Sequence, residues 1–281
     1  MGLIKKMIFR EFRSPHRSNG KSLAESKFKK PYSAEEFFLD GHRVTTIERS
    51  NFNQHHILFF HGGAYACDAS YMHRLMVQRF VDDGFRVTFF DYPMIPEHTA
   101  SFTNRWVIDA YQKLVLKYPD DTYVIFGDSA GGGLSLVFRM LIRDQKITPV
   151  PQNSVLASPW LDVSMSNPDI LHLSDLDKVL PLDGLIWAGE RYAGELGVKN
   201  PYVSPIYGNL DDLGDILLFY STREMLVPDC ERFIELAKQA EATTVSSEVC
   251  DGLFHDYLLT IHTKAAKHAF RRITAFYLQE H

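Results

Sequence analysis

The sequence has few cysteines, no long apolar run and no internal repeat, and each absence excludes a class of protein. Its three cysteines, Cys67, Cys230 and Cys250, form no C-x-x-C pair and no metal-ligand spacing. This argues against a disulfide-stabilised secreted domain and against a zinc site. No stretch is apolar for long enough to span a bilayer, and no apolar segment of signal-peptide length follows the N-terminus. We therefore expect a cytoplasmic protein with reduced thiols and no metal.

Charge is distributed unevenly along the chain. The formal net charge is −5, but residues 1–30 hold nine Lys or Arg against two Glu, which leaves +7 there and −12 elsewhere. Such a basic segment is compatible with nucleic acid or an anionic membrane as partner. We favour a solvated cap element, because Ile4, Met7, Ile8 and Phe12 recur at helical spacing and can pack over an active-site mouth. No nucleic-acid partner and no stable membrane insertion are expected.

Short apolar runs alternate with amphipathic segments along most of the chain, which at 281 residues is compatible with a single domain. The runs lack the alternation of a half-exposed strand, which predicts a mostly parallel sheet with helices on both faces, an α/β fold. An irregular polar stretch at residues 165–200 indicates an insertion over the carboxyl edge of the sheet, where ligands bind. Strands are predicted at residues 56–60, 86–90, 123–126, 154–158, 216–220 and 245–249, with a hairpin at residues 36–48.

The strongest local signal is G-D-S-A-G at residues 127–131, between a predicted strand and a predicted helix. This arrangement is typical of a nucleophile elbow, in which Gly127 and Gly131 avoid collisions within a tight turn. The turn would raise the Ser129 hydroxyl to the rim of the sheet. The helix that follows would direct its N-terminal N–H groups at negative charge that develops there. The pattern therefore predicts Ser129 as a nucleophile.

A serine nucleophile needs a base and an orienting carboxylate. His255 follows the last predicted strand and precedes the last helix, which is the position that the order Ser…Asp/Glu…His requires. The carboxylate should follow the strand at residues 216–220, where Glu224 and Asp229 are both candidates. Because Asp229 comes after Pro228 and suits a helix N-cap, Glu224 is preferred and Asp229 stays an alternative.

The oxyanion of a tetrahedral intermediate needs N–H donors, and Gly62, Gly63 and Ala130 are the predicted ones. Ala130 directly follows the nucleophile, and two successive glycines after a buried strand let the backbone approach a substrate closely. His255 must be neutral to act as a base, so activity is expected to rise between about pH 6 and pH 7.

A series of motifs in the expected order resembles the hormone-sensitive-lipase-like carboxylesterases of the α/β-hydrolase fold. Three departures from that family occur: Ala64 replaces a third glycine, Pro93 replaces an arginine, and Glu224 replaces the commoner aspartate. The longer glutamate side chain must fold back to reach His255. The motifs are H-G-G-A (61–64), D-Y-P-M-I-P-E-H (91–98), G-D-S-A-G-G (127–132), S-P-W-L-D (158–162), P-Y-V-S-P (201–205), E-M-L (224–226) and G-L-F-H-D-Y (252–257).

The resemblance implies one α/β-hydrolase domain over residues 1–281, with a small helical cap from about residues 1–35 and 165–200. It also implies a serine carboxylesterase that acts on small, short-chain acyl esters without a cofactor. Two alternatives stay open: a formamidase-like amide hydrolase, because H-G-G-A-Y at residues 61–65 also resembles an H-G-G-x-W motif, and a non-catalytic small-molecule receptor on the same fold. The oligomeric state is open, and a homodimer is compatible with the sequence.

Overall fold

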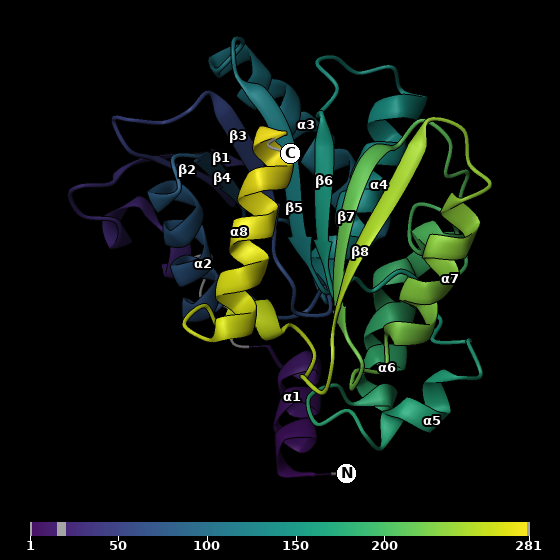
Figure 1. The fold of residues 1–281 in the computed structure, drawn as a ribbon. Coiled ribbons are helices and arrows are strands. Elements are labelled where there is room, and N and C mark those ends of the chain that lie inside the picture. The colour runs from purple at the N-terminus through teal and green to yellow at the C-terminus, as the bar shows by residue number, and fades with distance from the viewer. Residues whose placement is uncertain (1, 16–20, 280–281) are drawn as a thin grey trace.

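One sheet organises the computed structural model, which describes residues 2–15 and 21–279 (Figure 1). Its eight strands within that range are ordered β1-β2-β4-β3-β5-β6-β7-β8. Neighbours from β4 through β8 pair in parallel, whereas β2 pairs antiparallel with both β1 and β4. The strands are β1 (Ser33–Leu39), β2 (His42–Glu48), β3 (His55–Phe60), β4 (Arg86–Phe90), β5 (Thr122–Asp128), β6 (Asn153–Ala157), β7 (Gly214–Ser221) and β8 (Thr243–Cys250).

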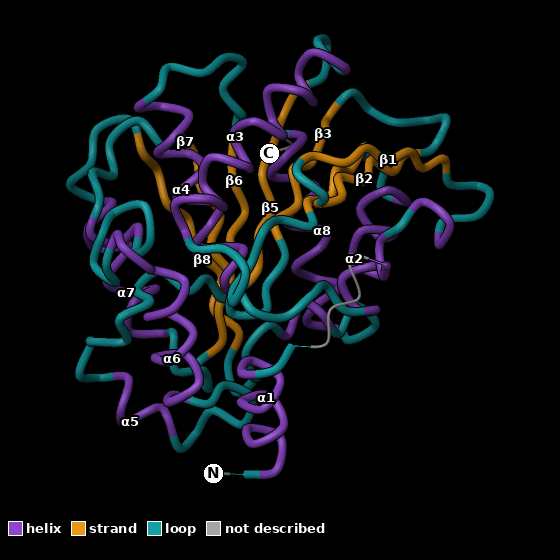
Figure 2. The backbone as a smooth tube through the Cα atoms, turned by 180° about the vertical axis from the view of Figure 1, so that it is seen from behind, coloured by secondary structure: helices purple, strands orange, loops and turns teal. Residues whose placement is uncertain are grey.

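Helices cover both faces of this sheet. Figure 1 shows α2 and α8 over one face, and the view from behind in Figure 2 shows α3 and α4 over the other. The helices are α1 (Leu3–Arg13), α2 (Tyr71–Asp82), α3 (Ala100–Lys117), α4 (Ala130–Asp144), α5 (Ile170–Ser174), α6 (Leu182–Ala193), α7 (Val227–Ala237) and α8 (Lys264–Leu278), with 3-10 turns at Lys21–Leu23, Glu25–Lys27, Gly194–Leu196, Pro205–Tyr207 and Tyr257–Leu259. None of the described helices is long and apolar enough to cross a membrane.

The central strands are buried on both sides, which explains why the sequence shows no alternation there. In β3, Ile57 and Phe59 belong to the core under α2 and α8, whereas Leu58 and Phe60 belong to the core under α3 and α4. Successive residues of a central strand such as β3 are therefore apolar, as a parallel sheet covered on both faces requires. The predicted α/β-hydrolase fold and the hairpin around Asp40-Gly41 are confirmed, the latter by the pairing of β1 with β2.

The segment at residues 165–200 is helical rather than irregular, because α5 and α6 lie within it. Glycines obscured the helical pattern of α6, and close packing explains them. A Cβ on Gly189 would lie 2.3 Å from the Val163 carbonyl oxygen, and one on Gly184 would lie 3.0 Å from a ring carbon of Phe9 in α1. Both glycines therefore let α6 approach its neighbours, at the cost of helix propensity.

Helix α1 joins α5 and α6 at the end of the molecule toward which the parallel strands run (Figure 1). Phe12 is buried, and the Lys5 Nζ donates to the Ser174 carbonyl oxygen at 2.6 Å. The remainder of the expected N-terminal cap includes residues 16–20, with Arg17, which lie outside the described residues. Helices from both segments of the proposed cap, α1 from the N-terminal one and α5 and α6 from residues 165–200, thus lie near the carboxyl edge of the sheet.

Candidate active site

Ser129 occupies a strained turn between β5 and α4. Its backbone has φ 51° and ψ −120°, a conformation that non-glycine residues rarely adopt. The turn is held from β6, because the Ser129 N–H donates to the Ala157 carbonyl oxygen at 2.8 Å and the Trp160 N–H donates to the Ser129 carbonyl oxygen at 2.8 Å. The predicted elbow geometry is therefore present, with Ser129 at the carboxyl edge of the sheet.

Substituting Gly131 by alanine is expected to destabilise the fold, because a Cβ there would lie 2.0 Å from the Phe60 carbonyl oxygen of β3. Helix α4 would have to move away from the sheet, at a cost of about 3 kcal/mol of unfolding free energy. The thermal midpoint should fall by roughly 5 °C or more. Gly2→Ala is the matched control, since a Cβ at Gly2 meets nothing within 4 Å. Equal midpoints for the two variants would contradict this packing.

Three predicted residues from distant segments form one chain of hydrogen bonds. The His255 Nε2 lies 2.9 Å from the Ser129 Oγ, and the His255 Nδ1 lies 2.5 Å from the Glu224 Oε2. All three side chains are buried, with residue exposures of 6% for Ser129, 5% for His255 and 0% for Glu224. A carboxylate on Nδ1 fixes the tautomer in which Nε2 can accept the serine proton.

The Glu224 side chain folds back, as its extra methylene requires. Its Oε1 accepts hydrogen bonds from the Ser221 N–H at 2.7 Å and from the Ser158 Oγ at 2.8 Å, which leaves Oε2 for His255. Sequence reasoning noted Ser158 only as part of a motif. Its position directly after β6, beside β7, was the available signal, because neighbouring parallel strands end at the same edge.

Asp229, the alternative acid, lies elsewhere. Helix α7 begins at Val227 and its N-cap is Leu226, so the N-cap interpretation of Asp229 is wrong. The Asp229 carboxylate accepts a hydrogen bond from the Asn167 Nδ2 at 2.9 Å, and burial raises its pKa to about 6. Asp229 therefore contacts the segment that leads into α5, and of the two candidate acids it is Glu224 that contacts His255.

The expectation for Gly62 needs correction, because its N–H is occupied. It donates to the Asp128 Oδ2 at 3.0 Å, so Gly62 does not offer this group to a substrate. In the described part of the chain, the N–H groups of Gly63, Ala64 and Ala130 make no hydrogen bond. The loop still lies against the nucleophile, since a Cβ on Gly62 would be 2.9 Å from the Ser129 Cβ.

Asp128 and His73 are structural partners of the site that sequence reasoning missed. The Ser70 N–H donates to the His73 Nδ1 at 2.9 Å, and the His73 Nε2 lies 3.1 Å from the Asp128 Oδ2. Because Nδ1 accepts a hydrogen bond, the ring proton of neutral His73 is on Nε2, which donates a hydrogen bond to Asp128. Helix α2 thus helps to hold the carboxylate that fixes the Gly62 loop. The signal in the sequence was the acidic residue beside the serine.

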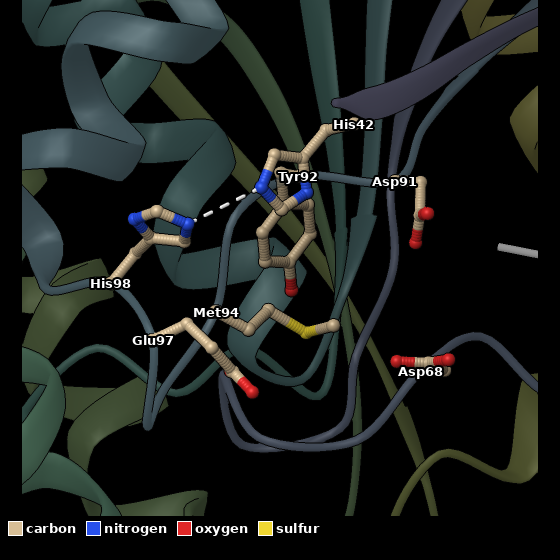
Figure 3. A pocket seen from close by; sticks show the side chains of 7 residues that line it. All are labelled: His42, Asp68, Asp91, Tyr92, Met94, Glu97 and His98. Atoms are coloured by element: carbon tan, nitrogen blue, oxygen red, sulfur yellow. Dashed lines mark hydrogen bonds between the residues drawn. The ribbon is translucent and has the colours of Figure 1, made fainter. Parts of the chain in front are cut away.

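The loop at residues 91–98 supports the same region from β4. The Tyr92 hydroxyl donates to the His61 carbonyl oxygen at 2.6 Å, and the Ile95 N–H donates to the Tyr65 carbonyl oxygen at 2.9 Å. A cavity of about 210 Å³ lies beside this loop and is lined by Tyr92, His42 and His98 among others. Figure 3 shows the side chains that line it. Ser129, His255 and Glu224 do not line this cavity. The loop therefore helps to position the H-G-G-A turn.

Carboxylates surround His255 on two sides. Burial alone would lower its pKa, but Asp256, whose Oδ2 lies 3.2 Å from Nε2, and Glu224 outweigh burial and raise the pKa well above its ordinary value. The rise in activity with pH is therefore expected above the range of pH 6 to 7 inferred from an unperturbed histidine. Among the described residues, no group of three or more His, Cys, Asp or Glu is arranged to hold a metal ion.

Comparison with known proteins agrees with this geometry. An esterase of Acinetobacter venetianus is 28% identical over 225 residues, which cover 78% of this chain and 73% of that protein. An acetyl-hydrolase of Streptomyces hygroscopicus is 29% identical over 201 residues, covering 71% and 67%. The crystal structure of an esterase from the bacterial hormone-sensitive lipase family superposes with a TM-score of 0.83 at 23% identity, covering 99% of this chain and 96% of the other, and so shares its fold.

The family itself is established by a sequence model described as alpha/beta hydrolase fold, which matches residues 57–259. The chain belongs to this family. The family match and the esterase and acetyl-hydrolase relatives support an ester hydrolase of the α/β-hydrolase fold, in agreement with the resemblance to the hormone-sensitive-lipase-like carboxylesterases.

Proposed function

We propose that the protein is a serine carboxylesterase that hydrolyses small, short-chain acyl esters through Ser129, His255 and Glu224. The hydrogen-bond chain from the Ser129 Oγ through both imidazole nitrogens to the Glu224 carboxylate carries this proposal. A receptor on the same fold would not need this alignment. The oxyanion donors that we propose are the N–H groups of Gly63, Ala64 and Ala130.

The reaction follows from the protonation states that these contacts allow. The Ser129 Oγ attacks the ester carbonyl carbon while the His255 Nε2 takes the hydroxyl proton, and Glu224 stabilises the resulting imidazolium. The carbonyl π electrons move to oxygen, where backbone N–H groups receive the negative charge. Collapse of the intermediate expels the alcohol, to which His255 returns the proton. Water then attacks the acyl-enzyme with His255 again as base, which restores Ser129.

A short acyl group suits the packing beside the proposed oxyanion loop. Tyr65, which follows Ala64, stacks on Tyr192 of α6 with ring centroids 3.6 Å apart, and on Trp160 with centroids 5.8 Å apart. All three rings are buried. We propose that this aromatic stack limits the length of the acyl chain that can lie between the loop and α6. The similarity to an acetyl-hydrolase supports the same choice.

A series of p-nitrophenyl esters tests the proposal. We expect kcat/KM to be highest for acyl chains of two to about four carbons and to fall by about tenfold or more at eight, because longer chains meet the aromatic stack. A matched aryl formamide, assayed in parallel, is expected to react more slowly than the esters. Preference for the formamide would favour the formamidase alternative, and preference for long acyl chains would refute the short-chain assignment.

A further inference from the structure

The Asp256 carboxylate contacts the reactive face of the imidazole. Its Oδ2 lies 3.2 Å from the His255 Nε2, the same nitrogen that lies 2.9 Å from the Ser129 Oγ. Asp256 is 8% exposed, and its other carboxylate oxygen has no hydrogen-bond partner. The catalytic triad of a serine hydrolase uses one carboxylate, on the opposite nitrogen, and that position is filled here by Glu224.

Two hydrogen-bond acceptors that face one another repel. The contact between the His255 Nε2 and the Asp256 Oδ2 is therefore favourable only when Nε2 carries a proton. With a neutral imidazole, Nε2 presents a lone pair to Oδ2; with an imidazolium, the Nε2 proton is donated to the carboxylate. We propose that Asp256 is a positioning residue that holds His255 in its protonated resting form and so moves the onset of catalysis to higher pH. This inference rests on the proposed function of His255 as the base.

The backbone places Asp256 for this contact. The residue has left-handed φ 56° and ψ 40°, which turns its side chain back toward the ring of the preceding residue. Its N–H donates to the Ser158 Oγ at 3.3 Å, and the same hydroxyl donates to Glu224. One serine therefore links the Glu224 carboxylate to the backbone of Asp256.

Charged groups from every neighbouring element contribute to this environment. Glu224 comes from the loop after β7, Asp128 from the end of β5, and His73 from α2. Farther out, His61 lies near His73 and Asp128, and Cys230 lies near Glu224. Asp128 and Glu224 both act to raise the pKa of Asp256, after burial itself. Within the described residues, Asp256 supplies the carboxylate oxygen that lies near Nε2, at 3.2 Å, beside the Ser129 hydroxyl at 2.9 Å.

The test is the pH dependence of kcat/KM for a p-nitrophenyl ester in Asp256→Asn and Asp256→Gly, both of which tolerate a left-handed backbone. The acid limb is expected to move to lower pH by about one unit or more, so that below the wild-type limb each variant is up to about tenfold faster than the wild type. On the alkaline plateau, where the imidazole is neutral in all three proteins, the variants should be no faster.

Asp251→Asn is the matched control, because Asp251 lies in the same loop, is exposed, and accepts from the Thr222 Oγ1 rather than from the imidazole. Its acid limb should stay in place. An unchanged limb in both Asp256 variants, or an equal shift in Asp251→Asn, would overturn the proposal. Titration of the His255 ring by ¹⁵N NMR without substrate measures the pH at which the imidazole loses its proton, independently of turnover. If the wild type hydrolyses no ester, the proposed function fails while the NMR titration still decides the role of Asp256.

Discussion

Ser129→Ala is expected to lower kcat/KM for p-nitrophenyl acetate on the order of 10⁵-fold, because the variant has no oxygen to form the acyl-enzyme. The methyl group fits where the hydroxyl lay, so the oxyanion donors and the His255–Glu224 pair should persist. Residual hydrolysis would come from those groups alone. The variant should also fail to react with a fluorophosphonate probe, which labels an activated serine. Mass spectrometry of the labelled wild type should place the adduct on residue 129.

Ser135→Ala controls for the loss of a buried hydroxyl near the same turn. The Ser135 Oγ donates only to the Gly131 carbonyl oxygen, one turn back in α4. Activity in this variant should remain within about threefold of the wild type, since the bond lies within the helix. Probe labelling that survives in Ser129→Ala would refute Ser129 as the nucleophile.

Glu224→Gln is expected to lower kcat/KM by about 10⁴-fold through the wrong tautomer of His255. The Glu224 Oε1 accepts from the Ser221 N–H and the Ser158 Oγ, so a glutamine would keep its carbonyl oxygen there. Its amide N–H would then face the His255 Nδ1. That nitrogen would have to accept, and the proton would move to Nε2, where it blocks deprotonation of Ser129. The variant should fold normally, and KM should change much less than kcat.

Asp229→Asn should be mild by comparison, with activity within about threefold of the wild type. Burial raises the pKa of Asp229 to about 6 in the folded protein, above its value in the unfolded chain. As the pH rises between these two values, ionisation of the buried carboxylate lowers the free energy of unfolding. Removing the charge should leave thermal stability at pH 8 equal or higher. A large loss in Asp229→Asn with a small one in Glu224→Gln would assign the orienting acid to Asp229.

Local patterns predicted the elements well where a single segment contains the whole signal. Strand β4 lies at residues 86–90, as expected, because a short apolar run between turn residues has few other solutions. The interpretation failed for α6, whose Gly184 and Gly189 reduce helix propensity. Those glycines are explained only by Phe9 and Val163, which lie in other segments. The N-cap interpretation of Asp229 was wrong for a similar reason, because the N-cap of α7 is Leu226, three residues earlier.

The sequence by itself determined the fold, the elbow around Ser129 and the order in which Ser129, Glu224 and His255 follow one another, since strand periodicity and chain order are properties of the linear pattern. Tertiary structure alone decided which polar groups meet. It assigned the Gly62 N–H to Asp128, brought the Glu224 carboxylate to the His255 Nδ1, and set Asp256 against the His255 Nε2. The physical reason is range: a hydrogen bond requires two atoms within about 3 Å, and that separation depends on how segments far apart in the chain pack together.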